Sequence, residues 1–481
     1  MSILEEIFYS STHILPEWVL FVGILATCLA LSVTREGNKS TFYLFGLTVL
    51  LYLYSLMISV PQVTAEGRDL YQGLLHLDKK ALLIKQLCGI AAIIFMVHAR
   101  LFSYKPAGEV YVLVLFVLFG ISFLSMTTHF MTAYVSLELI SLASYVLAAS
   151  GKAKKNFEAG IKYLIFGATA TALMLFGISL FYGISHSLNF SSSQFAESVA
   201  LNPTGPVSII AFMVLGGFLF KIAAAPFHQW VPDVYETTST PVISFLSFAP
   251  KAAGFVFISR MVSADFTDLN YTLALIIVLS LTVGNSAAIW QNDFKRMLGY
   301  SGIAHSGFIL TGLITGNNSD VYGTFFYLVA YLPMTMGSFF LADFIQKKGQ
   351  TLDIPSMGGL GKKYPLLALN AIAILISLVG FPPTIGFLAK LVVFSSLADA
   401  ASVTPGYLLY GLLVFGLFNA AIALYYYLRP VYMMIVRDPL SKNTGFSYDL
   451  LITLVLSYFS FTIIYLFLRP DLVSEWVGGL F

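Results

Sequence analysis

Two lysines and several prolines lie in one strongly apolar stretch, residues 218–255. Lys221 is followed five residues later by Pro226, and Lys251 comes directly after Pro250. A lysine at the centre of a membrane-spanning helix costs about 2.5–3.5 kcal/mol on insertion scales, so the two oppose insertion by about 5–7 kcal/mol. Burial disfavours the charged form of a lysine, and a nearby carboxylate favours it. Both lysines are therefore predicted to gain and lose protons.

Three more ionisable residues lie deep in apolar segments. Glu138 has serines and Tyr145 around it, which is typical of a proton relay or an ion site. Lys390 follows Pro383 by seven residues, which is about 10 Å along a helix axis. At this depth its ammonium does not easily reach the membrane interface. His305 lies among serines and glycines, which indicates a hydrated site. The alternatives are a buried packing role for Glu138 and His305 and an interfacial ammonium for Lys390.

Weaker candidates surround these five residues. His228 follows the first proline break, and Lys295 is half of a basic pair at the start of a predicted helix, where it anchors topology or assists proton uptake. Lys85, Lys162 and His98 lie within one or two turns of predicted helix ends. Snorkelling to the membrane interface explains these last three residues.

The composition places the chain in a membrane. Of its 481 residues 58% are apolar and only 10% are charged, whereas about a quarter of the residues of a soluble domain are charged. The apolar runs suit helices and are too long for the strands of a membrane barrel. We predict an all-α polytopic bundle with about fourteen spans, at residues 16–33, 41–60, 81–99, 109–127, 130–149, 157–183, 207–231, 240–262, 271–290, 297–315, 322–343, 365–397, 405–428 and 448–468.

Loop charge gives the predicted orientation. The odd-numbered loops hold sixteen Lys or Arg residues, against five in the even-numbered loops and the tail. Because basic loops stay on the inner side, both termini are predicted to lie outside.

The seventh and twelfth predicted helices are interrupted by proline. Pro226 frees the carbonyl of Ile222, and Pro382 and Pro383 free those of Leu378 and Val379. Each break falls in the fourth helix of a five-helix unit, and an odd number of helices inverts the second unit, as in inverted-repeat transporters. The predicted division is a three-helix segment, a first repeat, a second inverted repeat and a C-terminal helix, at 1–108, 109–265, 266–430 and 431–481.

The sequence contains no motif for a redox or nucleotide cofactor. Cys28 and Cys88 lie in apolar runs and match no metal spacing, and no P-loop or dinucleotide fingerprint stands in its proper context. We therefore expect that the chain binds neither cofactor nor metal. A lysine-rich interior also disfavours a bound metal cation, so the proton is the predicted ion.

Five segments closely resemble the antiporter-like membrane subunits of respiratory complex I. They are KYLIFGATATALMLFGISLFYG, FKIAAAPFHQWVPDVYE, PVISFLSFAPKAAGF, NDFKRMLGYSGIAHSGF and GFPPTIGFLAK, at residues 162–183, 220–236, 241–255, 292–308 and 380–390. The resemblance extends over about residues 110–430. Lys390, where subunit M has a glutamate, and the absence of the lateral helix of subunit L favour the subunit N group, the counterpart of mitochondrial subunit 2.

The resemblance implies a role for each matching residue. It makes Glu138, Lys221, Lys251, His305 and Lys390 a proton relay. It further implies a subunit of a translocase in the bacterial inner membrane, next to subunit M and the small subunits J and K. NAD, FMN, iron–sulfur clusters and quinone are expected in partner subunits, and none in this one.

The predicted mechanism is electrostatic. A proton enters from the inner side toward Lys221, where Glu138 stabilises it, passes Lys251 and His305 to Lys390, and leaves on the outer side. One alternative is a subunit of a multisubunit Na⁺/H⁺ antiporter, and another is a purely structural spacer of the membrane arm.

Overall fold

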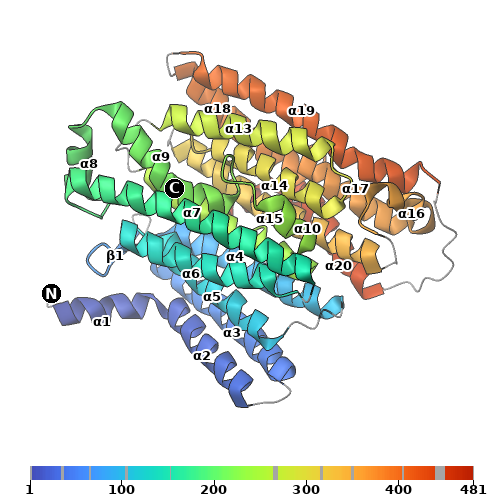
Figure 1. Ribbon diagram of the computed structural model, residues 1–481, viewed down its shortest axis with the longest axis horizontal. Coiled ribbons are helices and arrows are strands. Elements are labelled where there is room, and N and C mark those ends of the chain that lie inside the picture. The colour runs from blue at the N-terminus through green and yellow to red at the C-terminus, as the bar shows by residue number, and fades with distance from the viewer. Residues whose placement is uncertain are drawn as a thin grey trace.

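A computed structural model gives the fold of the chain (Figure 1). It describes residues 3–33, 37–63, 67–102, 104, 107–151, 153–263, 269–314, 318–347, 351–403, 406–438 and 450–479. The helices lie side by side in one elongated bundle. The order along the chain runs across the bundle, from α2 and α3 at one edge, through α7 and α9, to α18 and α19 at the opposite edge (Figure 1).

The N-terminal part consists of four helices and a small hairpin, in which Arg68 pairs with Leu77 and Leu70 with Leu75. The sequence analysis did not predict this antiparallel hairpin. The elements are α1 (Ile3–His13), α2 (Leu15–Val33), α3 (Gly37–Ser59), the 3₁₀ turn η1 (Val60–Gln62), β1 (Arg68–Leu70), β2 (Leu75–Leu77) and α4 (Lys79–Leu101).

Eight helices follow in the first predicted repeat. They are α5 (Gly108–Met126), α6 (Phe130–Ala149), α7 (Lys154–Ser185), α8 (Ser193–Ala200), α9 (Thr204–Ile222), α10 (Val231–Thr237), α11 (Thr240–Leu246) and α12 (Ala249–Ser263).

The remainder holds α13 (Asn270–Ile289), α14 (Phe294–Thr311), α15 (Asn318–Lys347), η2 (Ile354–Met357), α16 (Leu360–Lys363), α17 (Pro365–Val379), α18 (Ile385–Val403), α19 (Leu408–Ile435), α20 (Leu450–Leu468) and α21 (Pro470–Gly478).

Thirteen helices in the described part of the chain are long and apolar enough to cross a membrane. They overlap thirteen of the predicted spans, of which 365–397 is divided between α17 and α18, and the fourteenth, 297–315, overlaps α14. This helix forms as predicted, but its basic residues and His305 lower its hydropathy. The protein is a multi-pass membrane protein, which confirms the predicted helical membrane fold.

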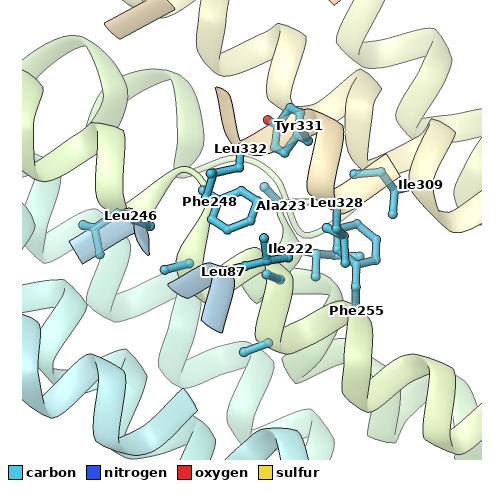
Figure 2. Packing of buried hydrophobic residues seen from close by; sticks show 14 of the residues in the cluster. Leu87, Ile222, Ala223, Leu246, Phe248, Phe255, Ile309, Leu328, Tyr331 and Leu332 are labelled. Carbon is cyan, nitrogen blue, oxygen red and sulfur yellow. The ribbon is translucent and has the colours of Figure 1, made fainter. Parts of the chain in front are cut away.

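The two predicted interruptions are present. α9 ends at Ile222, where Ala223 adopts a left-handed conformation with φ 62°, and helix resumes only at α10. α17 ends at Val379, where Gly380 has φ 84°, and α18 begins at Ile385. Buried hydrophobic side chains from several helices belong to the same cluster as Ile222 and Ala223 at the first break (Figure 2). They include Leu87 of α4, Ile309 of α14 and Leu332 of α15.

Candidate proton-transfer site

Lys221 lies in the last turn of α9, and its side chain is only 1% exposed. Its ammonium donates to the hydroxyls of Ser144 at 3.3 Å, and of Ser141 and Tyr163 at 3.4 Å. Among the described residues, no carboxylate oxygen lies within 4.0 Å of Lys221 Nζ. The buried ammonium of Lys221 is thus surrounded by neutral hydroxyl groups.

Glu138 lies on α6, one turn before Ser141. It is half-buried, and Oε1 accepts a hydrogen bond of 2.7 Å from Thr171 of α7. Glu138 is therefore held by α7 and makes no ion pair with Lys221. The carboxylate therefore acts on Lys221 through space.

Lys251 lies on α12, is 2% exposed, and contacts α14. Its Nζ donates to the Gly302 carbonyl at 2.8 Å and lies 3.4 Å from Ser306 Oγ. Ser306 in turn donates to the carbonyl of Ile222. Pro226 frees that carbonyl, as the sequence predicts, and its hydrogen bond with Ser306 now joins the end of α9 to α14. The main chain beside Lys221 is thereby linked to the surroundings of Lys251.

His305 is enclosed by tyrosines. Nδ1 lies 2.8 Å from the hydroxyl of Tyr327, and Nε2 lies 3.0 Å from that of Tyr427. Tyr427 also contacts Ser301 through its hydroxyl. Because phenol hydroxyls both donate and accept, either tautomer of the imidazole is satisfied here.

Lys390 folds back from α18 onto the second break and is 6% exposed. Its ammonium donates to the carbonyls of Val379 and Leu378, at 2.5 and 3.4 Å. These are the carbonyls that the sequence predicts to be freed. Nζ also lies 4.4 Å from the ring centroid of Phe308, whose electrons favour a cation. α14 therefore carries groups that contact both Lys251 and Lys390.

The weaker candidates lie apart from this series. Lys295 is buried, and its Nζ donates to the Thr238 carbonyl at 2.6 Å on the wall of a cavity of 730 Å³. Nδ1 of His228 is buried and has no hydrogen-bond partner among the described residues. The structure does not bring His228 into contact with Lys221.

Two interpretations of the sequence were wrong. Lys85 does not reach an interface: it is 1% exposed and lies 2.7 Å from Oε1 of Glu17, which is equally buried. His98 is fully buried, 3.0 Å from Asp343. The partners are far apart along the chain, so only the acidic residue inside an apolar run, Glu17, hinted at a buried pair. Lys162, by contrast, is 43% exposed and pairs with a carboxylate at the helix end.

The family is shown by comparison with known proteins. Residues 127–422 match the family described as NADH:quinone oxidoreductase/Mrp antiporter, TM. NADH-quinone oxidoreductase subunit N of Chlorobium chlorochromatii is 34% identical over 450 residues, which cover 89% of this chain and 85% of the relative. The chain belongs to the subunit N family of NADH-quinone oxidoreductases.

Two solved assemblies contain chains similar to this member of the subunit N family. Respiratory complex I from Thermus thermophilus matches with a TM-score of 0.79 and 29% identity, over 95% of this chain and 98% of the other. The Mrp complex from Dietzia sp. DQ12-45-1b matches with a TM-score of 0.84 and 18% identity, over 97% and 96%. The second likeness concerns the fold alone.

The predicted subunit N resemblance is thus confirmed. The family match contains all five principal candidates, Glu138, Lys221, Lys251, His305 and Lys390. Glu17, Lys85 and His98 lie before it.

Proposed function

We propose that this protein translocates protons as the subunit N component of an NADH-quinone oxidoreductase. Electron transfer in partner subunits supplies the energy, because the proton-transfer groups of this chain are side chains without redox chemistry of their own. NAD, FMN, iron–sulfur clusters and quinone belong to those partners in this proposal.

One observation carries the proposal: Lys221, Lys251 and Lys390 are buried cations whose nearest partners are neutral. Hydroxyls hold the first, a carbonyl and a hydroxyl the second, and two carbonyls the third. Such ligands stabilise an ammonium less than a carboxylate does. Each lysine is therefore free to exist with or without its proton.

The proposed route follows the contacts of α14. A proton on Lys221, stabilised by Glu138, passes to Lys251. From there it moves along the tyrosine-lined His305 to Lys390 and leaves on the outer side. The driving change is a weaker field of Glu138 at Lys221, which favours proton release.

The proposed setting is the membrane arm in the bacterial inner membrane, with subunit M and the small subunits J and K as neighbours and both termini outside. The two interrupted helices fit the division into a first repeat, 109–265, and an inverted second repeat, 266–430. The segment 1–108 and the helix in 431–481 flank these repeats.

The test is Lys221→Ala in the assembled enzyme. We expect electron transfer from NADH to quinone with proton pumping lost or strongly reduced, measured together in sealed vesicles. Normal pumping by an assembled Lys221→Ala enzyme contradicts the proposal and favours a structural spacer. Sodium–proton exchange that persists without NADH and quinone favours the alternative, an antiporter subunit. The Mrp complex from Dietzia sp. contains a chain of the same fold.

A further inference from the structure

A cavity of 730 Å³ opens where the N-terminal segment meets both predicted repeats. It lies at the end of the bundle that loop charge assigns to the inner side. Its wall carries charges of both signs, contributed by α7, α10, α14, α15 and the residue before α14: Lys155, Glu236, Asp293, Lys295, Asp343 and Lys347. Burial raises the pKa of Asp293, so this carboxylate binds a proton more readily than an exposed aspartate does.

Asp343 connects this cavity to a fully buried histidine. Its Oδ2 lies 3.0 Å from Nε2 of His98, and Asp343 itself is 13% exposed. The imidazole stacks on Phe340 with ring centroids 3.8 Å apart, and its Nδ1 lies 3.3 Å from Ser244 Oγ. His98 thus has a carboxylate on the cavity side and a hydroxyl on the other side.

The hydroxyl side leads toward Lys251. Ser244 lies on α11 and Lys251 on α12, with Ser247 in the turn between the two helices. Both serines are fully buried. Lys251 follows Ser244 by seven residues.

We propose that Asp343 and His98 form a proton-accepting dyad. Through this dyad, protons from the cavity reach Lys251 without first binding to Lys221. This inference rests on the proposed function and adds a second uptake route to it. Cavity water protonates the Asp343 carboxylate, which passes its proton to Nε2. Nδ1 then releases its own proton past the Ser244 hydroxyl to the neutral amine of Lys251, which becomes an ammonium, so the ring ends neutral, as the other tautomer. Only O–H and N–H bonds change.

The charges near the dyad set its pH dependence. Asp343 is the carboxylate that faces His98, and Lys295 lies on the same cavity wall. Lys347 lies one turn from Asp343, 5.8 Å from the ring centroid of Phe102. A titrating His98 therefore makes proton uptake fall as pH rises more steeply than it does in a variant without the imidazole.

The first experiment compares His98→Gln and Asp343→Asn with the unaltered enzyme in sealed vesicles. Glutamine retains a donor for Asp343 but does not titrate in this range. We expect proton uptake per NADH oxidised to fall by no more than about twofold, far less than the factor of ~100 expected of a sole transfer group, because the Lys221 route carries the larger share. Asp399→Asn, an exposed carboxylate on α18, is the matched control and leaves uptake unchanged.

The outcomes separate the two proposals. Normal uptake and an unaltered pH profile in His98→Gln, together with lost pumping in Lys221→Ala, overturn the dyad and leave the proposed function standing. Normal pumping in Lys221→Ala overturns the proposed function whatever His98 does.

A second measurement does not depend on activity. Deuterium exchange at the imidazole C2 position, read by mass spectrometry, reports whether water and protons reach each histidine of the assembled enzyme. We expect measurable exchange at His98 and slower exchange in Asp343→Asn, with the exposed His186 as the reference. A His98 that stays unexchanged after His186 has exchanged fully is a sealed packing residue, and the dyad is then wrong.

Discussion

Lys85 and Lys221 are equally buried, each 1% exposed, yet their surroundings differ in kind. Lys85 lies 2.7 Å from the carboxylate of Glu17, and no further hydrogen-bond donor in the described part of the chain reaches that carboxylate. Lys221 has three hydroxyls at 3.3–3.4 Å. A buried pair holds both partners charged, since the loss of one strands the other. Hydroxyls tolerate a lysine in either state. Burial alone therefore does not identify a candidate proton carrier. The chemistry of the groups around the ammonium distinguishes the two lysines.

The largest effect is expected at the paired lysine. Lys85→Met leaves Glu17 buried without its cation, which costs about 3–5 kcal/mol of stability. The thermal unfolding of the purified enzyme and the yield of assembled complex measure this loss. The double variant Glu17→Gln/Lys85→Met restores most of it, while Lys162→Met at the surface changes stability far less. Equal losses in the single and double variants contradict the ion pair as the cause.

The unpaired lysines are expected to show the reverse pattern. Lys251→Met strands no carboxylate, so stability changes by about 1 kcal/mol or less, whereas pumping falls about 100-fold. Pumping and unfolding are measured on the same preparation. If Lys251→Met destabilises the enzyme as strongly as Lys85→Met does, the distinction between the two kinds of buried lysine fails.

Gly380 positions the third lysine. Its φ of 84° is left-handed, and an added Cβ lies 2.7 Å from Cδ of Lys390. Gly380→Ala is expected to cost about 1–2 kcal/mol in backbone strain and to displace Lys390 from its carbonyls, with a severalfold loss of pumping. Gly411→Ala is the matched control, because nothing lies within 4 Å of its added Cβ. An unchanged pumping rate in Gly380→Ala shows that the lysine functions without this placement.

The smallest effect is expected at the surface pair of Asp233. Burial by itself would raise the pKa of Asp233, but hydrogen bonds from Lys162 and Arg296 hold the pKa below its ordinary 3.8. The stabilisation is present above pH 3.8 and is lost as pH falls through the lowered pKa. Since Asp233 is 32% exposed, solvent screening limits it to below about 1 kcal/mol.

The check on Asp233 is thermal unfolding against pH. Asp233→Asn is expected to be slightly less stable than the unaltered enzyme near pH 7 and to match it at the lowest pH reached, with Asp399→Asn as the control. A gap that widens on acidification contradicts the sign.

Local rules predicted much of this molecule. Hydropathy located the spans because a membrane helix is defined by its own residues. Proline chemistry identified the carbonyls of Ile222, Leu378 and Val379, and each accepts a hydrogen bond from a side chain of the candidate site or next to it. These features depend on neighbours within one turn, so the sequence contains them.

Contacts between distant elements were beyond those rules. Glu17 and Lys85 lie on α2 and α4, and His98 and Asp343 on α4 and α15. From the sequence alone, snorkelling explained both Lys85 and His98, because their acidic partners were unknown. Only the packing of the helices shows that each forms a buried pair instead. The distance from Glu138 to Lys221 is likewise set by how α6 and α9 pack, which no spacing in the chain encodes.

The polar character of α14 has a consequence for biogenesis. This helix alone among the predicted spans falls short of the apolarity of a membrane-crossing helix in the described part of the chain, yet it packs between α13 and α15. Because the translocon inserts segments according to their hydrophobicity, α14 by itself is expected to partition poorly into lipid. We expect α14 to enter the bilayer as the second arm of a hairpin with α13, so that the helix that carries His305 and Ser306 depends on its neighbour for insertion.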